Sequence, residues 1–300
     1  MKGNNFSRFL LLFEILNFLI NYDWFFWLVG KFNGSGWIKS VFLSYPANRE
    51  YAKEYAYSFR MGSWKIRLSG FLRQNRKIII MFSIFVVEEK EFLKKDNKEK
   101  MEEVVRHMEK IRRLVRADEK TFAGILPGLL SKRKIIDKSP EANLTALIVV
   151  EAVELVRKKN GLDEKIPIVV LGGRGFIGKM VVDKLKLVQK SDIYVVDLTG
   201  RDNKWPERET RKIIINVARH NTIGFYLDAL REGDIILNEA YPGPSSEVIS
   251  EIKSLNCDCF HVVGVEASAF PQFTRVYNGG IPCCAAWNAD DRKIIIKKLT

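Results

Sequence analysis

A glycine turn with the spacing of a dinucleotide-binding loop lies in the second half of the sequence. Residues 166–171 form a short run rich in isoleucine and valine, which is typical of a buried parallel strand. The run leads into Gly-Arg-Gly-Phe-Ile-Gly at 173–178, which fits the G-x-G-x-x-G pattern between strand and helix. We expect Gly173 to permit the tight turn, Gly175 to let the backbone approach a pyrophosphate, and Gly178 to let the helix pack closely. The unpaired amides that begin this helix suit a diphosphate. The predicted cofactor-binding residues of the turn are Gly173, Arg174, Gly175, Phe176, Ile177 and Gly178.

Two side chains after the next predicted strand bear on the choice of cofactor. Asp197 lies near the end of the run 192–198 and 24 residues after Gly173. This is about where an acidic side chain binds the adenosine ribose hydroxyls of NAD. Arg201 follows closely and has two interpretations. It pairs with the 2′-phosphate of NADP if its loop folds over the ribose, or it is a solvated surface arginine. Both NAD and NADP therefore stay open as cofactors.

Adjacent cysteines near the end of the chain are the candidate nucleophiles. Cys283 and Cys284 follow a glycine pair and a proline, at the predicted start of a last helix. A helix N-terminus lowers a thiol pKa and favours the thiolate. The alternative is that they pack as small apolar residues. Neither this pair nor Cys257 with Cys259 has the spacing of common zinc ligands, so we expect no metal site.

Strand and helix patterns continue to alternate after the glycine turn. Such alternation predicts a parallel sheet covered on both faces, with ligands beyond the carboxyl ends of its strands. Glu239 lies at such an end and is a candidate catalytic residue, or else a loop carboxylate with a structural partner. His220 also ends a strand, whereas His261 falls early in one and is expected to be a core histidine. The predicted strands are 212–218, 234–239 and 260–265, and the predicted helices are 222–231 and 245–255.

The composition is that of a globular protein of about two domains. Hydrophobic residues make up 47% and charged residues 28%, which allows a sizeable core. The formal net charge of +13 suits nucleic acid, an anionic membrane or acidic molecules and proteins. Because the basic residues are dispersed and no nucleic-acid-binding signature occurs, we do not expect nucleic acid as a partner.

The N-terminal residues 9–29 are the most apolar part of the chain. A membrane-spanning helix here would bury Glu14 and Asp23, each at a cost of about 3 kcal/mol near the bilayer centre. We therefore predict an apolar helix over 7–21 and a buried strand over 24–29. Contact with a membrane surface through 7–29 stays open.

The region between this segment and the glycine turn is predicted to mix helices and strands. A helix is expected over 46–60, a buried strand over 77–87 and a charged helix over 88–116, broken at 96–97. Residues 121–130 form an apolar loop with glycine and proline, of the kind that lines a site or a domain interface. Ser139 and Pro140 then begin a connector helix over 140–160.

The order of these features resembles a known family, the aldehyde-forming long-chain acyl-(acyl carrier protein) reductases. The similarity covers about the last 200 residues and rests on three stretches: the loop 121–130, the glycine turn 173–178, and the cysteine segment 281–286. Trp287 lies where the family is expected to have an acidic residue. Residues 143–146 match only part of the sequence motif that the family has in its connector helix. The resemblance implies that a cysteine thiolate forms an acyl-enzyme thioester and that NADPH releases the aldehyde. It makes Cys284 the nucleophile, with Cys283 as the alternative.

Together these features predict an α/β protein with a C-terminal Rossmann-type, doubly wound parallel sheet. The expected domains are an N-terminal α/β domain, 1–138, and a dinucleotide-binding domain, 139–300. We expect a cytoplasmic, homodimeric NAD(P)-dependent oxidoreductase that reduces an acyl thioester, or oxidises an aldehyde, through a cysteine thioester, with an acidic carrier protein as a candidate partner. One alternative is a dehydrogenase of a small polar metabolite that uses direct hydride transfer, with a lysine of the N-terminal domain or His220 as acid. Another is a nucleotide-binding or membrane-associated protein without catalysis.

Overall fold

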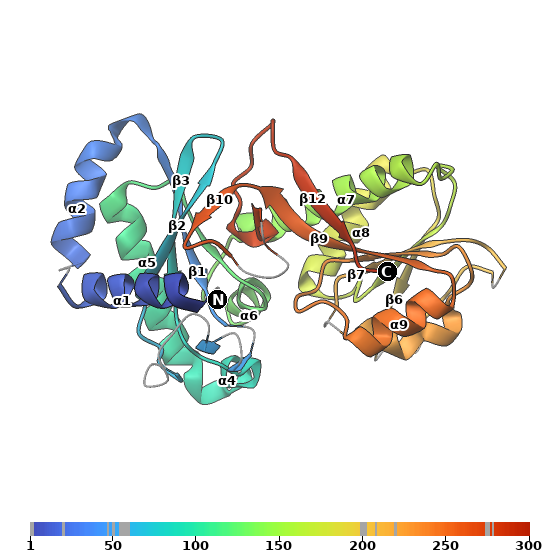
Figure 1. The fold of residues 1–300 in the computed structure, drawn as a ribbon, viewed down its shortest axis with the longest axis horizontal. Coiled ribbons are helices and arrows are strands. Elements are labelled where there is room, and N and C mark those ends of the chain that lie inside the picture. Colours follow the sequence, from blue (N-terminus) through green and yellow to red (C-terminus); the bar gives the residue numbers. More distant parts are fainter. Residues whose placement is uncertain are drawn as a thin grey trace. The chain divides into compact units, whose positions relative to one another are not determined.

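The computed structural model describes residues 3–19, 22–46, 48–49, 52–53, 61–198, 203–207, 209–218, 221–273, 277 and 279–300. The chain divides into two compact units, of which the first contains residues 1–141 and 265–292 and the second 142–264 and 293–300 (Figure 1). The predicted second domain ran without interruption to residue 300. In the structure, residues 265–292 belong to the first unit, and this stretch includes the cysteine segment. The predicted helix over 46–60 lies mostly outside the described residues.

The first unit is built on a mixed sheet of five strands in the order β10-β2-β3-β1-β4. The central strands β1 and β3 are parallel, β1 is also parallel to β4, and β2 is antiparallel to both β3 and β10. The strand predicted over 77–87 is confirmed as β3. The bounds are β1 (Ile38–Ser44), β2 (Arg67–Gln74), β3 (Lys77–Ser83), β4 (Glu119–Phe122) and β10 (Ser268–Phe270).

The helices of the first unit include α1 (Gly3–Leu19), α2 (Tyr22–Phe32) and α5 (Lys98–Val115). The predicted strand over 24–29 is wrong, because these residues lie within α2. Phe26 and Gly30 are four residues apart and face α5, where a Cβ on Gly30 would lie 1.9 Å from the Leu114 carbonyl oxygen. The break predicted at 96–97 is confirmed. The shorter helical segments are η1 (Asn33–Ser35), α4 (Glu89–Leu93), η3 (Lys95–Asn97) and α6 (Leu126–Lys132).

The second unit contains five parallel strands in the order β6-β5-β7-β8-β9, which confirms the predicted α/β class. In chain order this is 2-1-3-4-5, and the order reverses between β5 and β7, where doubly wound folds bind ligands. The connector helix α7 (Pro140–Lys159) begins at the predicted proline and ends before Gly161, whose φ is +59°. The strands are β5 (Ile168–Leu171), β6 (Ile193–Val196), β7 (Ile213–Asn216), β8 (Ile235–Asn238) and β9 (Asp258–Glu266), and β12 (Ile294–Lys298) pairs with β9.

The helices of this unit are α8 (Phe176–Val188), η4 (Thr222–Ala229) and α9 (Ser246–Ser254). The segment predicted as a helix over 222–231 is a 3-10 helix with a kink at Tyr226. The Ser245 hydroxyl accepts a hydrogen bond from the Val248 amide and so caps α9. A hydrophobic core of this unit consists of the buried residues Val169, Leu171, Val196, Ile214, Ile223, Leu230, Ile236, Ile252, Cys257 and Cys259.

Within the described residues, no single helix is both long and apolar enough to cross a membrane. One pair of segments, Leu11–Leu19 with Tyr22–Ser35, reaches that length and composition only across a bend of 98°.

Candidate functional site

The glycine turn joins β5 to α8 and is held by its own backbone and by Asp197. The Gly175 amide donates to the Gly172 carbonyl at 2.9 Å, and the Lys179 amide begins the helical bonds by donating to Gly175. Among the residues that the structure describes, no side chain caps the N-terminus of α8. Its first amides are therefore open to an anion, and Arg174 and Gly175 are exposed beside them. The turn fits the diphosphate of a dinucleotide.

The structure corrects the part assigned to Gly173. The left-handed conformation of the turn falls on Gly172, whose φ is +81°. Gly173 is required instead because a Cβ there would lie 2.9 Å from Cγ1 of Val195 on the neighbouring strand. A Cβ on Gly178 would lie 2.1 Å from the Gly172 carbonyl oxygen, so only glycine lets α8 start this close to the turn.

Asp197 directly follows β6 and points to the glycine turn. Its Oδ2 accepts a hydrogen bond from the Arg174 amide at 3.1 Å. The side-chain amide of Asn203 makes two hydrogen bonds to the backbone of Asp197. Asn203 Oδ1 accepts from the Asp197 amide at 3.0 Å, and Asn203 Nδ2 donates to the Asp197 carbonyl at 2.7 Å. Sequence analysis missed Asn203, which has no motif. Arg201 lies outside the described residues, as does His220.

Three polar side chains form a buried ladder across neighbouring strands of the second unit. Asn216, Asn238 and His261 are register partners on β7, β8 and β9. Asn216 Nδ2 donates to Asn238 Oδ1 at 2.7 Å, and Asn238 Nδ2 donates to the Ala240 carbonyl at 2.7 Å and lies 2.9 Å from His261 Nδ1. Because both protons of that amide are then used as donors, Nδ1 accepts and Nε2 carries the proton. Burial lowers the pKa of His261 to about 4, which keeps the ring neutral.

Glu239 lies next to this ladder, at the carboxyl end of β8. Its amide donates to the Asn216 carbonyl at 2.9 Å, which fixes the backbone. Burial raises the pKa of its carboxyl to about 7. A carboxyl group that titrates near neutral pH can donate or accept a proton, as the predicted catalytic assignment requires.

The cysteine segment lies in the first unit as a short 3-10 turn, η6 (Cys283–Ala285), after the two-residue strand β11 (Gly280–Ile281). The predicted last helix is wrong, so no α-helix begins at the two thiols. Gln74 ends the turn, since its Oε1 accepts from the Trp287 amide at 3.1 Å and its Nε2 donates to the Trp287 carbonyl at 3.0 Å. These two bonds hold the chain out of a helical conformation.

The first resemblance stretch, 121–130, meets this turn. The loop predicted there is shorter in the structure, because 121–122 end β4 and 126–130 lie in α6. The turn η6 packs against β4, which begins that loop. Tyr45, after β1, accepts from the Ile125 amide and donates to Glu89 Oε1, both at 3.1 Å. Burial, then Glu89, then the charge of Cys284 hold the pKa of Tyr45 well above its usual range. Cys283 is buried and Cys284 is partly exposed, so Cys284 is the more accessible thiol.

Gly124 allows this arrangement, which sequence analysis did not anticipate. A Cβ at this position would lie 2.2 Å from the Tyr45 hydroxyl oxygen, and its φ is +57°. A side chain here would displace Tyr45 from both of its hydrogen bonds. The sequence shows a glycine in the stretch 121–130, but it does not show that this glycine makes room for Tyr45, because Tyr45 lies far away in the chain.

Glu141 adds a buried carboxyl group to the first unit. It begins α7 and is only 1% exposed, and neither carboxylate oxygen has a hydrogen-bond partner of normal geometry within the described residues. Burial raises its pKa to about 7, although the nearby Ser139 hydroxyl and backbone groups partly offset the effect. No sequence pattern marked this residue.

The other two cysteines are structural. Cys257 and Cys259 are buried in the core of the second unit. Burial raises the pKa of Cys257 to about 11 and that of Cys259 to about 12, so both stay protonated. None of the four cysteines forms a disulfide. In the part of the chain that the structure describes, no three His, Cys, Asp or Glu side chains gather into a metal site.

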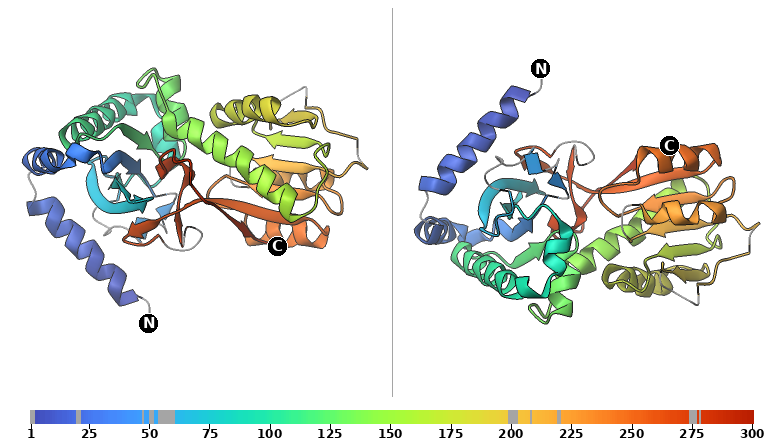
Figure 2. Two further views of the ribbon diagram at one scale, coloured as in Figure 1. Left: turned by 90° about the horizontal axis from the view of Figure 1, so that it is seen from above. Right: turned by 90° about the horizontal axis from the view of Figure 1, so that it is seen from below.

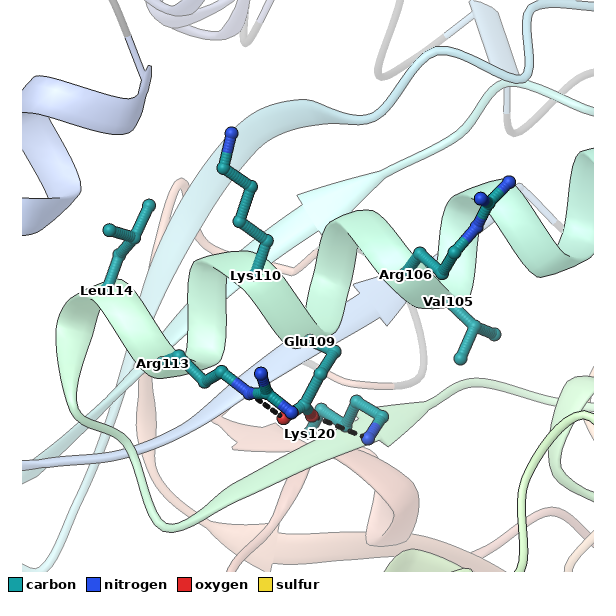
Figure 3. Close-up of a pocket in the computed structure, with 7 residues that line it drawn as sticks. All are labelled: Val105, Arg106, Glu109, Lys110, Arg113, Leu114 and Lys120. Carbon is teal, nitrogen blue, oxygen red and sulfur yellow. Dashed lines mark hydrogen bonds and ion pairs between the residues drawn. The ribbon is translucent and has the colours of Figure 1, made fainter.

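A separate pocket of about 610 Å³ lies over α5 and β4 of the first unit (Figure 3). Glu109 anchors it by ion pairs with Arg113 and Lys120, each at 2.7 Å. Hydrogen bonds from Arg112, and then from Lys120 and Arg113, hold the pKa of Glu109 well below its usual range. The pocket contains no residue of the glycine turn or of the cysteine segment. It is lined by Val105, Arg106, Glu109, Lys110, Arg113, Leu114 and Lys120.

Comparisons with known proteins give distant structural likeness only. No protein-family model matches the chain, and no curated protein matches it. Among solved structures, glutamate dehydrogenase from Peptoniphilus asaccharolyticus is 12% identical over 75% of this chain and 65% of its own, with a TM-score of 0.40. Shikimate 5-dehydrogenase from Listeria monocytogenes, solved with shikimate and NAD, is 13% identical over 75% of this chain and 86% of its own, with a TM-score of 0.35.

A third solved structure, a protein provisionally assigned as a malic enzyme (malate oxidoreductase), is 17% identical over 73% of this chain, with a TM-score of 0.38. This chain spans 65% of the length of that protein, as it does of the glutamate dehydrogenase. The function of this chain is therefore inferred from its own residues.

Proposed function

We propose that this protein is an NAD(P)-dependent oxidoreductase that reduces an acyl thioester to an aldehyde through Cys284. The observation that carries the proposal is the meeting of the partly exposed Cys284 with Tyr45 and the glycine-containing loop after β4. The open amides of α8 and the Asp197 carboxylate support a dinucleotide in the second unit.

The covalent step uses the cysteine turn of the first unit. The Cys284 thiolate attacks the carbonyl carbon of the acyl thioester, and the carrier thiol leaves with the proton that the cysteine gave up. The product of this step is an acyl-enzyme thioester on Cys284. When bound, the reduced nucleotide would supply a hydride to the carbonyl carbon of this thioester. The Cys284 thiolate leaves that carbon as the carbonyl group re-forms, which releases the aldehyde and restores the thiolate for the next acyl group.

The residues near Cys284 serve to position it. Tyr45 joins the loop at Ile125 to the Glu89 carboxylate and so fixes one side of the segment. The Gln74 amide fixes the other side through the backbone of Trp287. Neither group is assigned a role in bond making. Both hold the turn that presents the thiol.

A second candidate function follows from Glu239. Its carboxyl, with a pKa near 7 at the edge where the ligand of a doubly wound sheet binds, suits a general acid or base. In a dehydrogenase of a small polar metabolite it would exchange a proton with a hydroxyl or carbonyl group, with no covalent step. This mechanism predicts that alkylation of the thiols leaves turnover largely intact.

Titration with NADH and NADPH, followed by nucleotide fluorescence, tests the proposal when repeated after iodoacetamide. We expect one nucleotide to bind tightly, and Cys284→Ala to abolish turnover without weakening that binding. Cys283→Ala is the matched control and should keep most activity. Full activity in the double variant would refute the thioester mechanism and favour the Glu239 mechanism. The titration also decides between NAD and NADP. The proposal further includes a homodimer, a cytoplasmic location and an acidic carrier protein as partner.

A further inference from the structure

The helix α1 exposes apolar side chains along one stripe. Leu11, Ile15, Phe18 and Leu19 recur at helical spacing, and Phe18 and Leu19 are 88% and 70% exposed. Both views of Figure 2 show the N-terminal end of α1 pointing away from the rest of the first unit. A surface helix of a globular protein normally turns such a stripe toward the core. Here it faces solvent.

The opposite face of α1 carries Glu14 and Asn17 and contacts β2. The Asn17 side chain donates to the Leu68 carbonyl and accepts from the Leu68 amide, both at 2.8 Å. Glu14 pairs with Arg67 at 3.1 Å, and both side chains are mostly buried. Phe13 completes this contact by packing near Phe71. Glu14 and Asn17 are therefore used in contacts within the first unit, and the exposed stripe of Leu11, Ile15, Phe18 and Leu19 is apolar.

The next helix, α2, adds exposed aromatic side chains. Trp24 is 62% and Trp27 is 47% exposed, while Phe26 on the inner face is fully buried. Lys31 extends over the Trp27 ring, with Nζ 5.0 Å from its centroid. This combination of tryptophan and lysine is typical of the layer where hydrocarbon meets lipid headgroups.

Charge favours an anionic surface over a second apolar protein surface. The acids of the two helices, Glu14 and Asp23, are each paired with a cation of the same unit, Arg67 and Lys110. Lys31 stays exposed, and the chain as a whole carries a formal charge of +13. Protein interfaces tend to exclude lysine from their cores, whereas anionic lipid attracts it.

We infer that the exposed faces of α1 and α2 form a membrane-binding surface that lies in the plane of an anionic bilayer. This lipid-facing surface consists of Leu11, Ile15, Phe18, Leu19, Trp24 and Trp27, with Lys31 at the headgroups. The inference is independent of the proposed reaction.

Vesicle flotation of the full chain tests this surface. Vesicles of equal parts phosphatidylcholine and phosphatidylglycerol should bind the protein, and pure phosphatidylcholine should bind it more weakly. The triple change Ile15→Ser, Phe18→Ser and Leu19→Ser should lower the partition coefficient at least about tenfold, because three exposed apolar side chains no longer enter lipid. These positions are exposed in the fold, so the variant should stay folded.

A matched control removes equally exposed apolar side chains from the second unit, by Leu187→Ser, Val188→Ser and Phe225→Ser. This control should keep full vesicle binding. Absence of binding by the unaltered protein, or equal loss in both variants, would overturn the inference. So would a dimer that the α1 variant splits into monomers while vesicle binding is unchanged, since a second copy would then cover the face.

Discussion

The glycine turn of the second unit and the cysteine turn of the first unit differ in where their shape comes from. Between β5 and α8, the tightest constraint is local, since a Cβ on Gly178 would strike the carbonyl oxygen of Gly172, and Val195 on the next strand limits only Gly173. At η6 the constraint comes from Gln74, 213 residues before Trp287 in the chain. A turn of the first kind can be predicted from its own sequence, and a turn of the second kind cannot.

The strongest change at the local turn is Gly178→Ala. Alanine favours a helix by about 1 kcal/mol over glycine, so propensity alone predicts a gain in stability. The clash with the backbone instead predicts a loss of about 3 kcal/mol in the free energy of unfolding and much weaker nucleotide binding. Urea unfolding and NADH titration measure the two effects. Gly243→Ala is the control, because a Cβ there meets no atom within 4 Å. Equal behaviour of the two variants would contradict the close packing of α8.

The buried carboxyl group of Glu141 should make the free energy of unfolding depend on pH. Its folded pKa of about 7 lies above the ordinary value of 4.5, so the folded state holds a proton that the unfolded state releases. Stability should therefore fall as pH rises from about 4.5 to 7, by on the order of 3 kcal/mol at most. Glu141→Gln should reduce that slope in urea unfolding curves and leave the part that Glu239 contributes, whereas Glu232→Gln on the surface should leave the slope unchanged. A slope unchanged in Glu141→Gln would show that the group is not buried as described.

The distant constraint on the cysteine turn is tested by Gln74→Ala. The change leaves the Trp287 amide and carbonyl without their partner, at a cost of about 2 kcal/mol. We also expect turnover to fall while nucleotide affinity stays constant, because the glycine turn does not depend on Gln74. Differential scanning calorimetry and the NADH titration separate the two effects. A parallel loss of nucleotide binding would mean that the two sites are not built independently.

The smallest effect is expected for Asp197→Asn. Asparagine still accepts from the Arg174 amide, so stability should change little, but the charge that favours ribose hydroxyls is lost. Affinity for NADH should fall about tenfold, which corresponds to about 1.4 kcal/mol. Asp192→Asn, at an exposed position before β6, is the control. An affinity that rises for NADPH alone would place Asp197 at the 2′ position of the ribose, and unchanged affinities would remove it from the site.

What the sequence could predict follows the same division. The glycine turn, the connector helix at Pro140 and the strand order of β5 to β9 along the chain come from local patterns. The strand expected over 24–29 failed because an aromatic run fits strand and helix alike until its partner α5 is known. The ladder from Asn216 to His261 was missed because its members meet only through strand register.

The most direct test of the central claim is the mass of the intact protein after incubation with a long-chain acyl-coenzyme A and no reduced nucleotide. The thioester mechanism predicts an added acyl group, mapped to Cys284 and removed when NADH or NADPH is supplied. Cys284→Ala should show no adduct, and Cys283→Ala should show it in full. Steady reduction of the thioester without any adduct on Cys284 would contradict the mechanism.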